Sequence, residues 1–585
     1  MEYEEFVMTV RRDINCLSGD RNLKRNALVR LDGIVKGGNI SDEVLCRLFV
    51  EELHRPLFRL FGDASEKCRE LSLSMTRRFI DVVPLESLAN LLPLLLSALL
   101  GRFRPLPFPE QSEELRLESL QLLGVLFDLC TVRLAPFAGD IVDAISKALS
   151  DTCPDAKKEC CKLVKKVVSC CEADRVGCAC APLVASLLAN ARHQHWKVRW
   201  ATVDCLGPLL AIEPVMLDQM DEAFPQLNIL QSDRATAVRS SVAECVERWL
   251  LEGLRFRAPL VLTFDDDLGL AGFDKLEHRL VLLLLSSVAD DEVQVATQAL
   301  GGLERVAISK QDARLKRRRL EVEKARAAAT AAAALKGNPE EIIDDTGEAE
   351  IVVDLPAAFD YDQVKSLLTP PFLPGPSILA TALVELSLPV ILPQVLGNLI
   401  QWTTEIRGSA ARLLRVILVL ANERITPFLD QVLVHLYKAS ADDDLVVARG
   451  VLGCAEILGA MVDSGLLLRL VGQHLGLDVD GGVVCTRSHG VEEVWHESRV
   501  GRATTRTVQD TSANVKAFAA TSSENRKLVL RVLAHLVPGA ALQPCDVSTL
   551  TRFLEEGAQT DDLLPSVLTN VQAILERGGG NFCSQ

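Results

Sequence analysis

Residues 193–210, HQHWKVRWATVDCLGPLL, decide the fold of this chain. A short polar turn leads into a stretch in which apolar or small residues recur three and four positions apart. These residues are Val198, Ala201, Thr202, Cys205, Leu206 and Leu209. This spacing places them on one face of a helix, with Arg199 expected on the flank. We therefore predict a helix with one buried face that is entered through a polar turn.

The same two-part unit, a leucine-rich helix followed by a turn and a second helix, recurs along the chain. Predicted pairs lie at 44–62 with 67–80, 88–100 with 113–128, 136–149 with 155–169, 181–190 with 195–210, 216–229 with 233–250, and 275–288 with 290–305. A basic residue of the second helices recurs at Arg69, Arg116, Lys158, Arg199 and Arg239, in steps of 47, 42, 41 and 40 residues. Such a period is typical of HEAT repeats, so the sequence predicts an all-α solenoid (an ARM/HEAT superhelix) of about ten HEAT repeats.

Composition divides the predicted solenoid into parts. They are an N-terminal HEAT array at 1–307, a charged helix with an acidic, Pro-rich linker at 308–372, C-terminal HEAT repeats at 373–577 with a loop insertion at about 477–523, and a disordered tail at 578–585. Within the linker, residues 312–335 are rich in Ala, Glu, Lys and Arg, which have high helix propensity. We expect a solvated helix there.

Composition and charge exclude several classes of protein. Hydrophobic residues make up 48% of the chain but aromatic residues only 5%, which favours helix-on-helix packing. The net charge of −16 argues against general nucleic-acid binding. The longest apolar run, 88–100, contains Pro93 and is too short to span a bilayer, and the acidic N-terminus does not look like a secretory signal. With 17 cysteines and no export signal, we expect reduced thiols and a cytoplasmic protein.

Four stretches together resemble one protein family. They are HQHWKVRWATVDCLG (193–207), WLLE (249–252), LLLSSVADDEV (283–293) and WTTEIRGSAARLL (402–414). In this order, and with the charged interruption before the last of them, they resemble the dynein axonemal assembly factor 5 family of HEAT-repeat proteins. The resemblance implies a cytoplasmic, non-enzymatic scaffold that helps to pre-assemble axonemal dynein arms. The implied partners are axonemal dynein chains or chaperone co-factors.

The turns inside the repeats are the candidate binding site, because they line up along one edge of a solenoid. The candidate rim residues are Trp196, Lys197, Arg234, Asp290, Asp291 and Trp402, with Asp442 to Asp444 on the same edge. An exposed Trp beside basic side chains is a plausible anchor for a partner. The alternative is that Trp196 and Trp402 cap the core of a neighbouring repeat.

Metal, cofactor and catalytic sites are not expected. The cysteines at 160, 161, 170, 171, 178 and 180 lack the paired C-x2-C spacing of a structural zinc site, so we expect small apolar core residues. His193 and His195, and likewise Cys485, His489 and His496, are interpreted as exposed polar residues. The basic run Lys316–Arg319 is interpreted as a solvated helix, with a nuclear address or an acidic partner as the alternative.

Two other functions stay open at this point. Tubulin-binding arrays of the TOG type also use the turns inside repeats, so a cytoskeletal role competes with dynein arm assembly. A nuclear transport receptor or a phosphatase scaffold is the other alternative. An enzyme would need a bound metal or cofactor, and neither a phosphate-binding loop nor a nucleophile motif occurs in the sequence.

Overall fold

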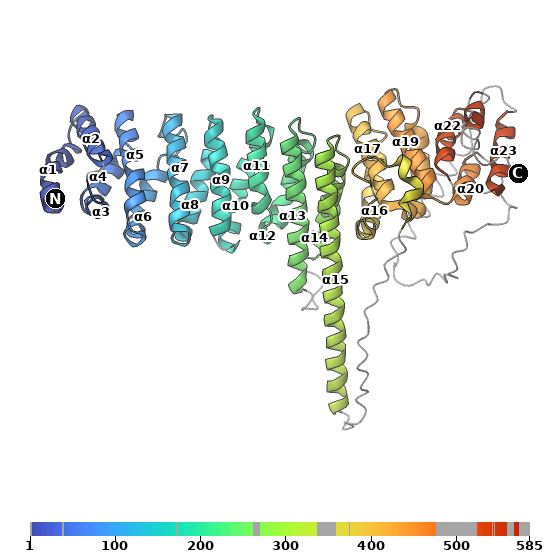
Figure 1. Cartoon of the computed structure of the whole chain (residues 1–585), viewed down its shortest axis with the longest axis horizontal. Helices are drawn as coiled ribbons and strands as arrows, with labels where there is room; N and C mark the ends of the chain where they lie inside the picture. Colours follow the sequence, from blue (N-terminus) through green and yellow to red (C-terminus); the bar gives the residue numbers. More distant parts are fainter. Residues whose placement is uncertain are drawn as a thin grey trace. The chain divides into compact units, whose positions relative to one another are not determined.

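The computed structural model describes residues 3–37, 40–170, 173–260, 270–335, 359–373, 375–475, 523–540, 542, 544–558, 565 and 567–572. Within these ranges the chain forms helices and turns, and no β-strand occurs. The chain divides into two compact units, Met1–Gly253 (unit 1) and Leu254–Gln585 (unit 2). In each unit, paired helices stack side by side (Figure 1), which confirms the predicted all-α solenoid.

Unit 1 contains α1 (Tyr3–Cys16), α2 (Arg21–Lys36), α3 (Asp42–Leu48), η1 (Phe49–Leu53), α4 (His54–Leu60), α5 (Glu66–Val82), α6 (Leu85–Leu100), α7 (Glu113–Cys130), η2 (Thr131–Phe137), α8 (Ala138–Ala148), α9 (Pro154–Cys170), α10 (Ala173–Ala189), η3 (Asn190–Arg192), α11 (Trp196–Leu209), α12 (Glu213–Leu230) and most of α13 (Thr236–Leu260). Unit 2 contains α14 (Leu270–Val288), α15 (Val293–Leu335), η4 (Tyr361–Leu367), α16 (Ile378–Asn398), α17 (Thr404–Ala421), η5 (Asn422–Phe428), α18 (Leu429–Ala439), α19 (Leu445–Met461), α20 (Ser464–Leu475), α22 (Ser523–Gly539) and α23 (Pro544–Ala558). Each helix pair predicted between residues 44 and 305 is present.

The apolar face of each second helix is buried against its neighbours. In α11, Val198, Cys205 and Leu206 are fully buried, which confirms the face predicted from their spacing. Second helices pack on second helices, as α9 does on α7 and α11, and first helices pack on first helices, as α10 does on α8 and α12. The buried indole of Trp249 donates its N–H to the carbonyl of Gly207, 2.9 Å away. This bond satisfies the one polar atom of a large side chain in the core.

A row of cation–carboxylate pairs, here called the inter-repeat ladder, joins successive repeats of unit 1. The cation is the fourth residue of a second helix, and the carboxylate lies in the turn before the next second helix. The pairs are Lys24–Asp63 (2.8 Å), Arg69–Glu110 (2.7 Å), Arg116–Asp151 (2.6 Å) and Arg199–Asp233 (2.5 Å). Each of the three arginines also donates to two backbone carbonyls of the turn before its own helix. One side chain therefore ties two adjacent turns together.

The ladder carboxylates also shape the turns in which they lie. Asp151 accepts the backbone N–H of Cys153 at 2.9 Å, and Asp233 accepts that of Ala235 at 2.8 Å. Burial alone would raise the pKa of Asp151, but hydrogen bonds from Arg116 and from the Cys153 N–H outweigh burial and lower it. The carboxylate therefore stays ionised inside the stack.

The structure corrects two sequence expectations about the basic position. Arg199 was expected on the flank of its helix, but it lies between repeats and pairs with Asp233. Lys158 was taken as the repeating residue of α9, but the fourth residue of that helix is Lys157. Lys158 instead pairs with Asp155 one turn away. Counting basic residues along the sequence selected the wrong lysine, because residues 157 and 158 are both lysine.

At α9 the ladder cation bonds to uncharged oxygens and not to a carboxylate. Lys157 is buried, and its Nζ donates to the carbonyl of Leu149 at 2.7 Å and to Oδ1 of Asn190 at 2.6 Å. The turn position that holds a carboxylate at Asp151 and Asp233 is occupied here by His193. Lys157 therefore bonds to amide and carbonyl oxygens, and its burial lowers the pKa of its ammonium group.

In the described part of unit 2, the ladder recurs at Arg407 and is missing at the junction of α15 and α17. Arg407, the fourth residue of α17, pairs with Asp442 at 2.5 Å and donates to the carbonyls of Gln401 and Trp402. The fourth residue of α15 is Ala296, which has no cationic group. Asp291 of the α14–α15 turn and Arg412 of α17, 3.6 Å apart, form an ion pair between these two repeats instead.

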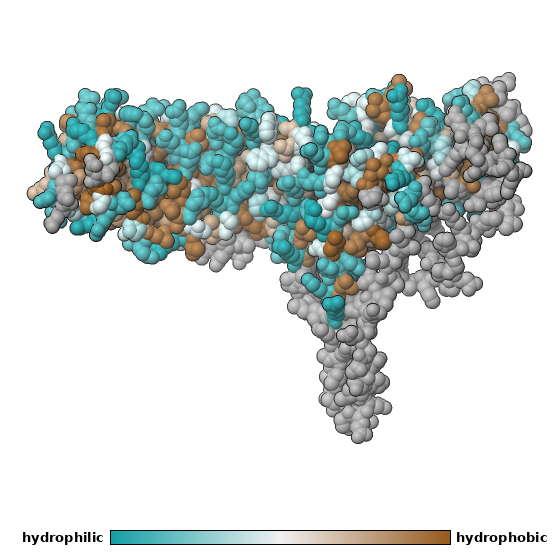
Figure 2. Space-filling model, viewed as in Figure 1, coloured by the Kyte–Doolittle hydropathy of each residue, from teal (hydrophilic) through white to brown (hydrophobic). Residues whose placement is uncertain are grey.

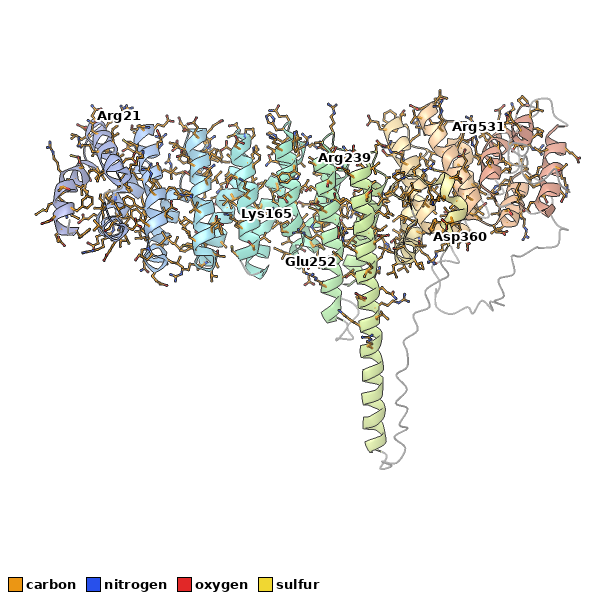
Figure 3. The ribbon with its side chains drawn as sticks, viewed as in Figure 1. Arg21, Lys165, Arg239, Glu252, Asp360 and Arg531 are labelled. Atoms are coloured by element: carbon orange, nitrogen blue, oxygen red, sulfur yellow. The ribbon has the colours of Figure 1, made fainter. Side chains whose placement is uncertain are left out.

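The end of the predicted linker, residues 359–372, packs on α17. Arg415 of α17 donates to the carbonyl of Leu367 at 2.9 Å, and the hydroxyl of Tyr361 donates to the carbonyl of Val419 at 3.0 Å. Leu368 and Phe372 are buried. This segment packs on the second helices of unit 2 as part of its core. Asp360, at the start of the segment, accepts the N–H of Asp362 (Figure 3).

Helix α15 is longer than its sequence pattern indicated. It runs without interruption from Val293 to Leu335 and extends well past α14 (Figure 1). The helix predicted at 312–335 is therefore present, as a continuation of a repeat helix. The expected insertion at 477–523 and the expected tail at 578–585 lie outside the described residues, apart from Ser523 at the start of α22. The domain limits at 307 and 372 stay predictions.

Two stretches, Glu113–Ala148 and Ile378–Asn398, are long and apolar enough to cross a membrane by length and composition alone. Both are longer than the run at 88–100 that the sequence analysis considered. In the structure they form repeat helices, and 44% and 50% of their most apolar windows are buried inside the chain. Core helices of a helical repeat pass the same test, so these stretches are weak evidence for a membrane span.

Candidate partner-binding rim

The six predicted rim residues fall into two groups, one in each unit. Trp196, Lys197 and Arg234 lie at the turns before α11 and α13 in unit 1. Asp290, Asp291 and Trp402 lie at the turns before α15 and α17 in unit 2. The repeat geometry explains this placement, because each of these turns immediately precedes a second helix. The two groups differ in charge, so we describe them separately.

The unit 1 group is aromatic and basic. Trp196 is the first residue of α11 and is 43% exposed, and Trp200, one turn further, is 41% exposed. The ammonium group of Lys197 lies 5.9 Å from the ring centroid of Trp196, within reach of a cation–π interaction. Arg199 pairs with Asp233, which brings the turn carrying exposed Arg234 next to this tryptophan pair. Trp200 was missed from the sequence, although its i, i+4 spacing from Trp196 was the available signal.

The unit 2 group is apolar and acidic. Trp402 is 91% exposed, so it does not cap the core of a neighbouring repeat. Leu445 and Val446 at the start of α19 are 67% and 73% exposed, and Ile406 in the first turn of α17 is also exposed. The exposure of these last three residues was not predicted from the sequence, because a helix start can face either the core or water.

Two of the predicted acidic residues have structural roles. Asp290 accepts the backbone N–H of Glu292 at 2.8 Å, as ladder carboxylates do in other turns. Asp291 is exposed and lies 3.6 Å from the guanidinium of Arg412. The α14–α15 turn therefore lies against α17. This turn, residues 367–372 and α17 line a small hollow of about 140 Å³.

The cysteine and histidine candidates lie in structural positions. Cys160 and Cys161 are buried in α9, and burial raises the pKa of the Cys160 thiol well above its usual range. A thiol held protonated in this way is a poor metal ligand. His193 accepts the backbone N–H of His195, and burial together with Lys157 lowers its pKa. The described residues contain no group of three or more His, Cys, Asp or Glu side chains placed to hold a metal ion.

Several predicted candidates lie outside the described residues. The side chains of Cys171, Cys178 and Cys180 lie outside the described residues, as do Cys485, His489 and His496. Of the basic run Lys316–Arg319, which lies in α15, Lys316 and Arg319 are exposed and the other two side chains are outside the description.

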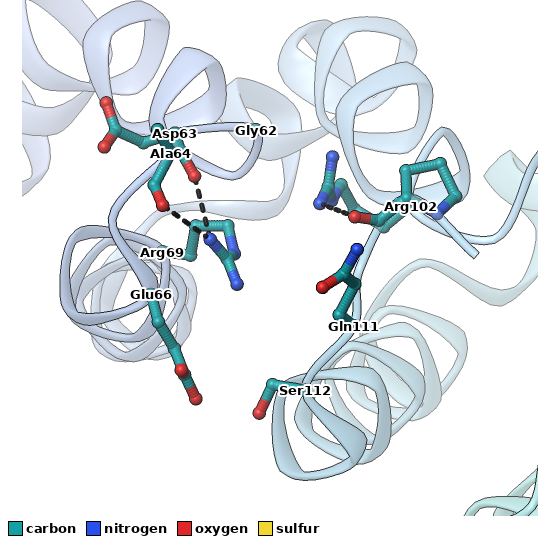
Figure 4. Close-up of a pocket in the computed structure, with 9 residues that line it drawn as sticks. Gly62, Asp63, Ala64, Glu66, Arg69, Arg102, Gln111 and Ser112 are labelled. Carbon is teal, nitrogen blue, oxygen red and sulfur yellow. Dashed lines mark hydrogen bonds between the residues drawn. The ribbon is translucent and has the colours of Figure 1, made fainter. Parts of the chain in front are cut away.

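A polar hollow of about 580 Å³ lies between the turns before α5 and α7 in unit 1 (Figure 4). Arg69, Arg102, Glu66 and Gln111 line it. Arg69 is committed to Glu110 and to the carbonyls of Asp63 and Ala64, and Arg102 donates to the carbonyl of Pro109. The hollow is therefore a gap between two ladder turns. The arginines that line it already bond to partners within the chain.

Comparison with known proteins identifies the family. A family model described as "Dynein axonemal assembly factor 5-like, TPR repeats" matches residues 16–257. A second, the HEAT-repeat domain of dynein axonemal assembly factor 5, matches residues 369–480. The chain belongs to the dynein axonemal assembly factor 5 family. One match precedes α15 in the sequence and the other follows it. Repeats of both units therefore match models of the assembly factor family.

Relatives named dynein axonemal assembly factor 5 match most of this chain. The Xenopus laevis protein is 26% identical over 461 residues, which are 79% of this chain and 48% of that protein. The human protein is 28% identical over 420 residues, 71% of this chain and 42% of that protein. The chain thus spans about half the length of these relatives or less.

Two of the solved structures that match this chain are engineered proteins. One is a designed armadillo repeat protein in complex with a (KR)4 peptide, which is 20% identical to this chain with a TM-score of 0.33. The match covers 41% of this chain and 98% of the designed protein. The other is an engineered protein that is 12% identical, with a TM-score of 0.25. That match covers 97% of this chain and 98% of the engineered protein.

Proposed function

We propose that this chain is a non-enzymatic scaffold that acts in the cytoplasm during pre-assembly of axonemal dynein arms. The observation that carries the proposal is family membership supported by repeats in both units. The relatives bear the name of an axonemal dynein assembly factor. The proposed partners are axonemal dynein chains or chaperone co-factors, held by the exposed turns of the repeats.

The geometry suits a scaffold. The inter-repeat ladder fixes consecutive turns against one another, so the exposed side chains on those turns are held in defined positions. Preorganised anchors lose less entropy on binding than mobile ones. Trp196 and Trp402 are exposed on such turns, and tryptophan is enriched among the residues that dominate binding energy.

The test is loss of this protein in a motile ciliated cell. We expect axoneme cross-sections in the electron microscope to lack dynein arms on an intact nine-fold array, and cytoplasmic dynein heavy chains to fall in amount. Re-expression of the chain is the control and should restore both. Normal arms and normal heavy-chain levels after complete loss would refute the proposal.

Tubulin binding is the second candidate, favoured by the aromatic and basic group of unit 1. Trp196, Lys197 and Trp200 present exposed rings beside an ammonium group on one helix start, which suits an acidic partner surface. Co-sedimentation with tubulin that disappears in a Trp196→Ala/Lys197→Ala/Trp402→Ala variant would support this alternative. Specific capture of Ran-GTP or of a phosphatase catalytic subunit would instead support a nuclear transport or phosphatase scaffold.

A further inference from the structure

The start of α17 and the start of α19 carry an exposed apolar surface that no fold requirement explains. We call Trp402, Glu405, Ile406, Asp443, Leu445 and Val446 the acidic-apolar rim. Hydrophobic surface reaches the upper end of α19 in Figure 2. Leucine, valine and tryptophan gathered at two adjacent turns are uncommon on a surface that contacts only water.

The two turns form one continuous surface, because Arg407 connects them. Its guanidinium pairs with Asp442 at 2.5 Å and donates to the carbonyl of Trp402 at 2.8 Å. Helices α17 and α19 pack directly on each other behind these turns. Trp402 and Leu445 therefore stand on a rigid base, with little freedom to fold back onto the core.

Helix capping explains some of the acidic residues here but not the apolar ones. Asp442 belongs to the ladder, and Asp444 accepts the N–H groups of Val446 and Val447 as the cap of α19. Within the described part of the chain, Glu405 and Asp443 form no ion pair, and both are exposed. The exposed cations nearest to these two carboxylates in sequence are Lys438, Arg449 and Arg412.

We infer that the acidic-apolar rim binds a helical segment of a client protein whose leucine-type face is flanked by Lys and Arg residues. The apolar side chains would accept the face of the client helix, and Glu405 and Asp443 would select cationic flanks. Such helix recognition uses apolar anchors for affinity and charge for specificity. The inference deepens the scaffold function proposed above and rests on it for its biological meaning.

Two model peptides test this chemistry. Both are helices of about five turns with identical leucine positions, and their polar positions carry Lys in one peptide and Glu in the other. We expect the full chain to bind the Lys peptide at least about tenfold more tightly than the Glu peptide by isothermal titration calorimetry.

Three variants locate the binding site. Trp402→Ala/Leu445→Ala should weaken Lys-peptide binding by about tenfold or more without changing the charge of the protein. Leu386→Ala/Val390→Ala, on the exposed side of α16, is the matched control and should bind as the wild type does. Glu405→Lys/Asp443→Lys should move the preference toward the Glu peptide.

Two outcomes would overturn the inference. One is equal binding of the Lys peptide to the wild type and to Trp402→Ala/Leu445→Ala. The other is no saturable binding of either peptide up to about 1 mM, where specific recognition would be lost. A rescue experiment separates this surface from the proposed function. If loss of the chain removes dynein arms but Trp402→Ala/Leu445→Ala restores them fully, the scaffold function stands and this surface is not needed for it.

Discussion

The buried pair Arg116–Asp151 should be the strongest single rung of the inter-repeat ladder. Asp151 has no exposed side-chain area, and the Arg116 side chain is 6% exposed. The two side chains share two hydrogen bonds, at 2.6 and 2.8 Å. In Asp151→Ala, the guanidinium loses both bonds and its counter-charge while it stays buried, and the N–H of Cys153 loses its acceptor. Breaking one side of a buried pair costs about 3–5 kcal/mol.

The matched control is the exposed pair Arg133–Glu86, also in unit 1. Glu86 is 83% exposed and Arg133 36%, so water replaces the lost contact in Glu86→Ala. We expect that variant to lose less than about 1 kcal/mol. A third variant, Arg116→Met/Asp151→Leu, should be less destabilised than Asp151→Ala, because it removes the uncompensated charge.

Hydrogen exchange of the full chain, followed peptide by peptide, is the appropriate assay. Each repeat contacts only its neighbours, so the loss should be concentrated in α7 and α9 and fade along unit 1. Urea denaturation at pH 7 gives the accompanying loss of total stability. If Asp151→Ala costs no more than Glu86→Ala, or if exchange rises equally in every helix, the ladder does not hold the repeats as we describe.

The pH dependence of this rung follows from the lowered pKa of Asp151. A carboxyl whose pKa is lower in the folded state stabilises the fold above its unfolded pKa of about 3.9. That contribution is lost as pH falls through the lower, folded pKa. The destabilisation by Asp151→Ala should therefore be constant from neutral pH to about pH 5 and shrink only in stronger acid.

Substitutions at three other positions test the ladder at Lys157 and the packing of glycines in α17 and α19. His193→Asp should stabilise unit 1 by about 1 kcal/mol in denaturation at pH 7, because it offers Lys157 the carboxylate that other ladder cations have; lower stability than His193→Asn would contradict this. Gly459→Ala should separate α19 from α22, since a Cβ there would lie 2.1 Å from the carbonyl oxygen of Leu536. Gly408→Ala, whose Cβ would meet only Val447 at 3.9 Å, should be neutral or gain up to about 1 kcal/mol in thermal denaturation.

Helix boundaries followed from the sequence where apolar spacing and turn residues agreed. The face of α11 and the pairing of each first helix with its second helix were predicted correctly, because burying one stripe per helix requires that spacing. From the sequence, only the cation of each ladder pair could be recognised, as a basic residue that recurs once per repeat. Its carboxylate partners lie 34 to 41 residues further along, and nothing local in the sequence connects a cation to them.

The sequence by itself determined the repeat, its period and its family, since those depend on local periodicity and on ordered motifs. Only the tertiary structure decided which side chains of each turn are exposed. Trp402 precedes α17 and Trp249 lies inside α13, yet the first is almost fully exposed and the second fully buried. The difference depends on whether a neighbouring helix covers the position, and residues 359–372 show how a segment predicted as linker can become that cover.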